Sequence, residues 1–108
     1  MASHATITDP VMTRFRQALT ESYGNRLERV VLFGSRARGD ARPESDYDVA
    51  VFLRGMVDRF QELDRLARLS TDLIDETGHV VNAMAYRAGA YNERTPLMRD
   101  IRLEGVDL

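Results

Sequence analysis

The chain contains no cysteine, no lysine and no tryptophan among its 108 residues. The absence of cysteine excludes disulfide bonds and thiolate chemistry, and it fits a reducing compartment. The absence of lysine excludes a Walker-type phosphate loop, Schiff-base catalysis and a lysine general base. The sequence also lacks any apolar run of about eighteen residues, and its N-terminus lacks the charged and apolar blocks of a signal peptide. We therefore expect a cytoplasmic protein without contact to a membrane.

All fifteen basic residues are arginines, and the formal net charge is −2. A chain with this charge balance has no overall attraction to nucleic acid, so we expect no direct binding of DNA or RNA. Arginine is nevertheless a good phosphate ligand because its planar guanidinium donates two parallel hydrogen bonds to an anion. A local group of arginines would therefore suit a small polyphosphate.

The length of 108 residues is enough for one domain with one core, and it is too short for two. The hydrophobic content of 44% and the charged content of 30% are those of an ordinary globular protein, which argues against disorder. We expect a single domain over residues 1–108, with a loose tail over residues 1–8.

The spacing of apolar residues predicts an alternation of helices and strands. Asp9-Pro10 is typical of a helix start, and Gly24 and Gly78 are typical helix ends. Helices are predicted over residues 10–23, 58–76 and 96–104, and strands over residues 28–33, 47–53 and 79–85. The order helix, strand, strand, helix, strand, helix favours an α/β (α+β) fold, with helices packed on a small mixed β-sheet.

Two alternate acids, Asp46 and Asp48, stand at the start of the second predicted strand. Because side chains alternate along a strand, both carboxylates would project to the same side, about 7 Å apart along the backbone. Two carboxylates so close repel each other unless a cation lies between them, and hard oxygen ligands suit Mg²⁺ or Mn²⁺. Asp-x-Asp alone, however, is more often a polar turn followed by a solvent-facing residue.

The residues at the end of the first predicted strand favour a binding site over a polar turn. Gly34 would let backbone N–H groups approach an anion, and Ser35 would add a hydroxyl and the positive end of a helical turn. Arg36 and Arg38 follow directly. A phosphate-binding segment and a pair of metal-binding acids would then converge from adjacent strands.

These residues resemble a known signature. Gly34-Ser35, ten intervening residues and Asp46-x-Asp48 are similar to the motif of the nucleotidyltransferase superfamily typified by DNA polymerase beta. More narrowly, GSRARGDARPESDYDVAV resembles the minimal nucleotidyltransferases, small antitoxins paired with HEPN-domain ribonuclease toxins. The resemblance implies the nucleotidyltransferase fold, a hetero-oligomer with such a toxin, and Mg²⁺-dependent transfer of AMP from ATP to a hydroxyl. In the antitoxins that it resembles, the acceptor is a tyrosine of the toxin.

The resemblance also implies roles for individual residues. Asp46 and Asp48 would be the catalytic acids and would hold up to two Mg²⁺ ions. Nucleotide would be bound by Gly34, Ser35, Arg36 and Arg38.

One position departs from the superfamily pattern, which has a third carboxylate on the next strand. The corresponding segment is Gly78-His79-Val80-Val81-Asn82, so Asn82 stands where an aspartate is expected. Asparagine offers a carbonyl oxygen but cannot act as a base. Three interpretations stay open: an enzyme that works with two acids while the acceptor or His79 handles the proton, an inactive binding module that neutralises the toxin by occlusion, or a different strand register.

Neighbouring residues do not supply the missing acid. Asp75 and Glu76 end a predicted helix and are expected to be exposed, and His79 is expected to be an ordinary surface residue. A small-molecule acceptor is a further alternative, but this chain would need a second subunit to complete a pocket for it.

Overall fold

The computed structural model describes residues 9–108, so the tail predicted over residues 1–8 lies outside the described residues. The elements follow in the order α1 (Pro10–Tyr23), η1 (Gly24–Arg26), β1 (Leu27–Phe33), α2 (Ser35–Arg38), β2 (Tyr47–Leu53), α3 (Arg59–Thr77), β3 (Val81–Arg87), η2 (Ala90–Asn92), α4 (Pro96–Glu104) and β4 (Val106–Asp107).

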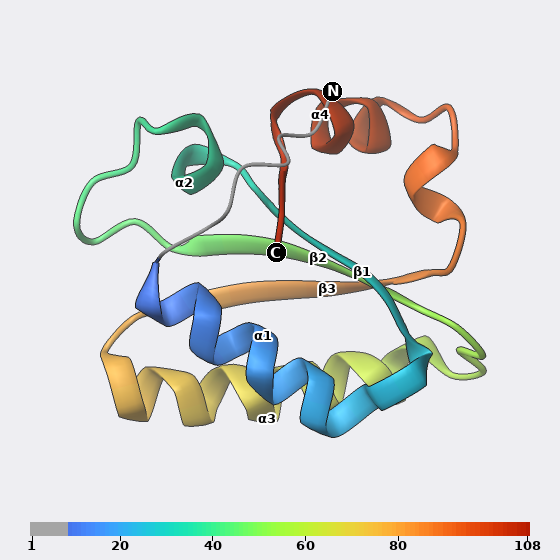
Figure 1. Ribbon diagram of the computed structural model, residues 1–108, viewed down its shortest axis with the longest axis horizontal. Helices are drawn as coiled ribbons and strands as arrows, with labels where there is room; N and C mark the ends of the chain where they lie inside the picture. The colour runs from blue at the N-terminus through green and yellow to red at the C-terminus, as the bar shows by residue number, and fades with distance from the viewer. Residues whose placement is uncertain (1–8) are drawn as a thin grey trace.

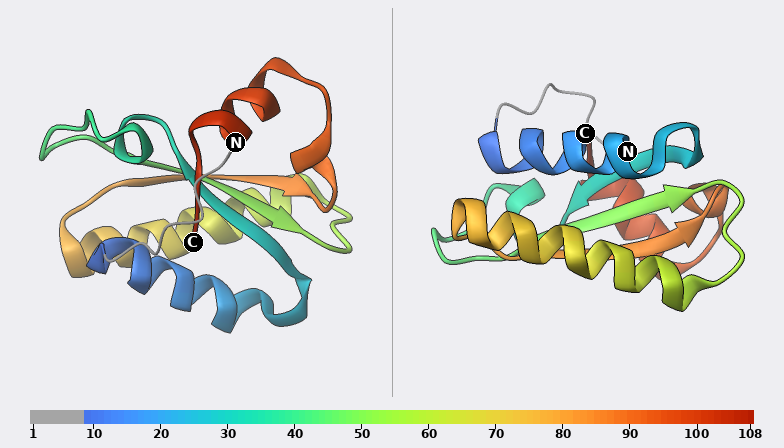
Figure 2. Two further views of the ribbon diagram at one scale, coloured as in Figure 1. Left: turned by 45° about the horizontal axis from the view of Figure 1, so that its top comes forward. Right: turned by 90° about the horizontal axis from the view of Figure 1, so that it is seen from below.

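The four strands form one mixed sheet with the order β3-β2-β1-β4. β1 runs antiparallel to both β2 and β4, whereas β2 and β3 are parallel because α3 connects them. Helices α1 and α3 cover one face of the sheet, and α4 lies on the other (Figure 1). The short helix α2 follows the end of β1, and its Ala37 packs against the core under α1 and α3. Viewed from below, α1 and α3 lie beside each other (Figure 2, right). The predicted small mixed sheet with flanking helices is confirmed.

The helix ends carry the capping residues that the sequence indicated. Asp9 accepts hydrogen bonds from the backbone N–H groups of Val11 and Met12, and Pro10 occupies the first turn of α1. Gly78 ends α3 with a φ of 77°. Asp58, predicted as the first residue of that helix, is instead its N-cap and accepts from the N–H groups of Phe60 and Gln61. Among the described residues, no helix is both long and apolar enough to cross a membrane.

Alternation along β2 divides the core between the two faces of the sheet. Val49, Val51 and Leu53 are fully buried in the cluster under α1 and α3. Ala50 and Phe52 are equally buried, but they contact the cluster formed with α4 and η2. Because both faces are covered, the strand is buried and apolar throughout except at Asp48, its second residue.

The structure differs from the predictions mainly at element ends. β3 begins at Val81 instead of residue 79, because the left-handed Gly78 and the hydrogen bond from His79 N–H to Thr77 Oγ1 still belong to the end of α3. The ends of β1 and α3 shift by one residue. The sequence reasoning missed β4, a strand of two residues that is too short to show any periodicity.

Candidate functional site

The two acids of the Asp-x-Asp motif lie where β2 begins. Asp46 is exposed and directly precedes the strand, and Asp48 is its second residue and partly buried. Tyr47, between them, is 3% exposed and points into the core under α1 and α3. Alternation therefore directs both carboxylates to the opposite side, as the sequence predicts.

Asn82 is the group that β3 brings to these acids. It pairs with Asp48 in the parallel register between β2 and β3, and its Nδ2 donates to Oδ2 of Asp46 at 3.1 Å. β3 starts two residues later than predicted. Asn82 nevertheless lies beside the two acids, where the family resemblance implies a third acid. The alternative of a shifted register is thereby removed.

Gly34, at the end of β1, contacts the same site. Its φ of 75° and ψ of −158° lie in a region that is essentially restricted to glycine. A Cβ atom at this position would lie 2.5 Å from Oδ2 of Asp48, so any side chain would collide with that carboxylate. Glycine therefore allows the backbone between β1 and α2 to approach Asp48, and Ser35 follows as the first residue of α2.

Arg36 holds the loop that precedes Asp46. Its guanidinium donates to the carbonyl oxygen of Ser45 at 2.8 and 3.2 Å and to that of Pro43 at 3.0 Å. The same group lies over the ring of Tyr47, 4.4 Å from its centroid. Its contacts are thus with the loop, a structural role that the sequence reasoning did not anticipate; its predicted contact with nucleotide stays a prediction.

Arg38 faces two carboxylates on the exposed side of α2. Its Nε donates to Asp40 at 3.2 Å, and its Nη1 lies 3.3 and 3.4 Å from the two carboxylate oxygens of Glu104. The hydrogen bond with Asp40 is the main cause of a raised pKa of the Arg38 guanidinium. The guanidinium therefore stays charged, and two carboxylates already pair with it.

Glu104 is a site residue that the sequence reasoning missed. It is the last residue of α4, and its Oε1 accepts the backbone N–H of Gly34 at 3.2 Å in addition to the guanidinium of Arg38. Nothing in the sequence marks it, because a single acid at a helix end, seventy residues after Gly34, belongs to no motif.

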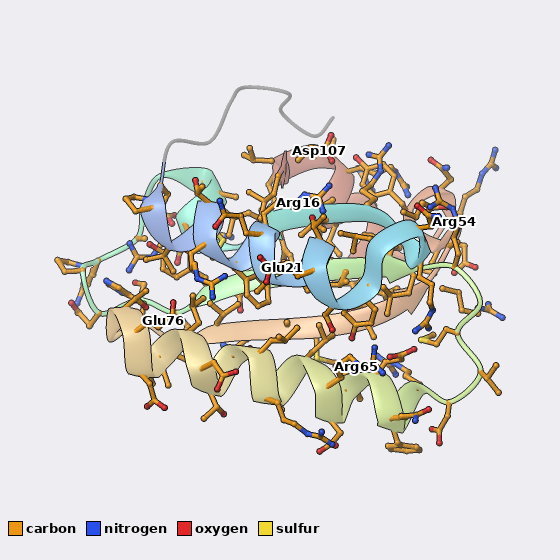
Figure 3. All side chains as sticks on the ribbon, turned by 60° about the horizontal axis from the view of Figure 1, so that its bottom comes forward. Arg16, Glu21, Arg54, Arg65, Glu76 and Asp107 are labelled. Carbon is orange, nitrogen blue, oxygen red and sulfur yellow. The ribbon has the colours of Figure 1, made fainter. Side chains whose placement is uncertain are left out.

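The other titratable residues near the motif lie elsewhere. His79 precedes β3, and its ring packs edge-to-face with that of Tyr47, with 5.8 Å between the ring centroids. Asp75 and Glu76 are exposed, as predicted, and Glu76 pairs with Arg14 of α1 at 3.0 Å. Figure 3 shows Glu76 on the last turn of α3. Both acids line a groove of about 460 Å³ between α1 and α3 and do not reach the site.

The donor set fits a cation that is shared with a phosphate-bearing ligand. Within residues 9–108, there is no group of three or more histidine, cysteine or acidic residues that could hold a metal ion alone. Asp46 and Asp48 do supply two hard carboxylates beside the Gly34 backbone. Mg²⁺ in nucleotide-using sites is commonly bound by one or two carboxylates, with phosphate oxygens and water completing its coordination.

Comparisons with known proteins identify a matching family and a related chain. The nucleotidyltransferase domain family matches residues 12–104. "Putative protein adenylyltransferase MJ0604" of Methanocaldococcus jannaschii is 34% identical over 86 residues, which cover 80% of this chain and 80% of the relative.

Two solved structures share the fold. A "putative nucleotidyltransferase from Sulfolobus solfataricus" superposes with a TM-score of 0.63 and 22% identity, over 90% of this chain and 75% of the other. A toxin-antitoxin structure with AMP-PNP gives a TM-score of 0.61 and 20% identity, over 86% of this chain and 68% of the other. The predicted nucleotidyltransferase fold is therefore confirmed.

Proposed function

Because the chain belongs to the nucleotidyltransferase domain family, we propose that it transfers AMP from ATP to a hydroxyl group of a partner protein. The proposed partner is a HEPN-domain toxin, for which the chain would be the antitoxin. Two similarities support this choice: the 34% identical relative is named as an adenylyltransferase of proteins, and one structural neighbour is a toxin-antitoxin pair with AMP-PNP.

The observation that carries the proposal is the convergence of three chain segments on one point. Gly34 from the end of β1, Asp46 and Asp48 from β2, and Asn82 from β3 are held together by the contacts described above. In the proposed complex, Asp46 and Asp48 would hold Mg²⁺, which would supply positive charge to neutralise the phosphates. Gly34 and Ser35 supply backbone and hydroxyl donors to the triphosphate, and the Arg38 guanidinium supplies a positive charge.

The proposed transfer needs only ATP, the acceptor hydroxyl and water as a proton acceptor. The acceptor hydroxyl oxygen forms a bond to the α-phosphorus of ATP, and the bond from that phosphorus to the oxygen bridging the β-phosphate breaks. Pyrophosphate leaves with the bonding electron pair, and the hydroxyl proton passes to water. Asn82 cannot accept this proton because its amide is not a base. What this chain contributes is the position and the charge of its groups, the usual contribution in phosphoryl-type transfers.

Transfer of labelled AMP tests the proposal. The purified chain is incubated with a HEPN toxin, Mg²⁺ and ATP labelled on the α-phosphate, and labelled toxin is expected. Asp46→Asn should abolish the labelling while leaving the circular dichroism spectrum unchanged. Asp72→Asn is the matched control, because Asp72 is an exposed acid of α3 that lines the groove on the other face. Labelling that survives Asp46→Asn would contradict the assignment of the acids.

The hydrogen bond between Asn82 and Asp46 favours a second candidate function, an antitoxin that neutralises its partner by binding alone. The amide supplies a donor at the place where a third acid would strengthen metal binding. Under this alternative, Asp46→Asn would still protect cells that express the toxin. Under the enzymatic proposal, the same variant would bind the toxin and fail to protect.

A further inference from the structure

The carboxylate of Glu104 binds two groups that the proposed function assigns to the triphosphate. It accepts the Gly34 N–H at 3.2 Å and faces the Arg38 guanidinium with both oxygens at 3.3 and 3.4 Å. These contacts join α4 to the β1–α2 junction, although the residues are far apart in the sequence. The C-terminal end of α4 lies beside α2 (Figure 2, left).

A carboxylate in this position presents the chemistry of a phosphate. It is an anion with two acceptor oxygens, it receives one backbone N–H, and both of its oxygens face one guanidinium nitrogen, Nη1 of Arg38. Phosphate oxygens accept from the same two kinds of donor. A triphosphate that bound Gly34 and Arg38 would bring like charge against Glu104 and would need the same donors. The single N–H of Gly34 cannot donate fully to both anions at once, so the two binding events compete for it.

The backbone at Glu104 is held in place by packing. Replacement of its carboxylate by phosphate therefore requires movement of the side chain only. The N–H of Gly105 donates to Ile101, and a Cβ on Gly105 would lie 2.3 Å from the Ile101 carbonyl oxygen and 2.5 Å from a Val31 methyl group. Ile101 is fully buried, and Val106 pairs with Leu32 of β1. The side chain of Glu104, by contrast, keeps 29% of its surface exposed and can turn toward solvent.

We propose that Glu104 is an internal competitor of the triphosphate, which sets the nucleotide affinity of the site by occupying Gly34 N–H and Arg38 until nucleotide displaces it. This inference rests on the proposed nucleotide site. Under this proposal, a residue of α4 affects how tightly nucleotide binds. Arg38 pairs with Glu104 in the free protein and with phosphate in the nucleotide-bound protein. The competing pair is partly exposed, so its effect on affinity is moderate.

The test compares the dissociation constant of Mg²⁺–AMP-PNP, measured by calorimetry, for the full chain and three variants. Glu104→Gln removes the charge and keeps the shape, and it should bind AMP-PNP about three- to tenfold more tightly. Glu104→Asp keeps the charge but shortens the side chain by one methylene, and it should also bind more tightly. Asp100→Asn, an exposed acid one turn earlier on α4, removes the same charge without the contact and should match the parent chain.

Each result decides a different point. Equal or weaker affinity in both Glu104 variants, while the parent chain binds AMP-PNP, overturns the competition and leaves the nucleotide site intact. An equal gain in Asp100→Asn also overturns it, because general charge would then explain the effect. If neither the parent chain nor any variant binds AMP-PNP, the proposal of a nucleotide site is itself contradicted. A second measurement does not depend on the variants: the Gly34 amide resonance should shift when AMP-PNP is added to the parent chain, and an unmoved resonance at saturation counts against the exchange of partners.

Discussion

The side-chain nitrogen of Asn82 lies 3.1 Å from Oδ2 of Asp46 and donates a hydrogen bond to it. Asn82 also stands beside Asp48 in the parallel register of β2 and β3. An amide therefore contacts one acid and neighbours the other at the edge where both carboxylates meet. The amide donor reduces the repulsion between the two acids and adds no charge. A third carboxylate would increase that repulsion.

Replacing this amide by an acid should make the stability of the protein depend on metal. In Asn82→Asp without Mg²⁺, three carboxylates repel one another, and we expect a loss of about 1 kcal/mol, or roughly 5 °C in Tm. Saturating Mg²⁺ should restore the Tm, and AMP transfer should rise at least about tenfold because the new carboxylate can act as a base. Differential scanning fluorimetry with and without Mg²⁺ measures the first effect.

The matched control for this change is Asn92→Asp, at an exposed asparagine of η2 away from the acids. It adds the same charge and should show no Mg²⁺-dependent Tm. A Mg²⁺ response of equal size in Asn82→Asp and Asn92→Asp would show that Asn82 does not adjoin a metal site.

Alanine substitutions at two glycines distinguish the effect of backbone strain from the effect of contact with the site. Gly34 and Gly39 have φ values of 75° and 84°, so alanine is strained at both and should cost about 1–3 kcal/mol of stability. Only at Gly34 would the added Cβ also meet Asp48, because nothing lies within 4 Å of a Cβ at Gly39. We expect Gly34→Ala to lose AMP-PNP binding and Gly39→Ala to keep it, as measured by calorimetry below the Tm of both. Loss of binding in both variants would remove the special role of the Gly34 contact.

Much of this site could be predicted from the sequence because its parts lie at strand ends. Gly34 and the acids follow from where two apolar runs stop and start, whereas Asn82 follows from the resemblance to the minimal nucleotidyltransferases, which have an acid at this position after Gly78. These inferences tolerate errors in element ends: β3 starts two residues late, yet Asn82 still pairs with Asp48. Local patterns determine which face a strand residue occupies, and that was sufficient here.

The contacts that the sequence did not reveal depend on tertiary packing. Glu104 meets Gly34 only because β4 pairs with β1 and fixes the end of α4, and a strand of two residues leaves no periodic signal. Arg36 resembles an anion ligand in sequence, but the loop returning from α2 brings the Ser45 carbonyl to its guanidinium. Long charged side chains reach several partners, so composition alone does not determine which one they bind.

Arg36 should therefore act on the position of Asp46 through the loop. Arg36→Lys keeps the positive charge but cannot donate to the Ser45 and Pro43 carbonyls together, so we expect it to behave like Arg36→Gln. Both should speed amide hydrogen exchange over residues 40–46 and lower the rate of AMP transfer about tenfold, with little change in the KM for ATP. Arg42→Gln, in an exposed residue of the same loop, is the control. If Arg36→Lys retains the parent rate, the charge matters and the loop contacts do not.

The alkaline limit of stability should depend on Tyr23, which closes α1 and is 5% exposed. Burial, reinforced by the Glu62 carboxylate, raises the pKa of Tyr23 from 10.0 to about 12. Below pH 10 this tyrosine is protonated in both states and has no effect. Between pH 10 and 12 the unfolded chain loses the proton first, so the free energy of unfolding should fall, by about 2 kcal/mol from this residue. Urea unfolding of Tyr23→Phe should show a shallower decline over this range than the parent chain, and parallel pH profiles would show that Tyr23 ionises equally in both states.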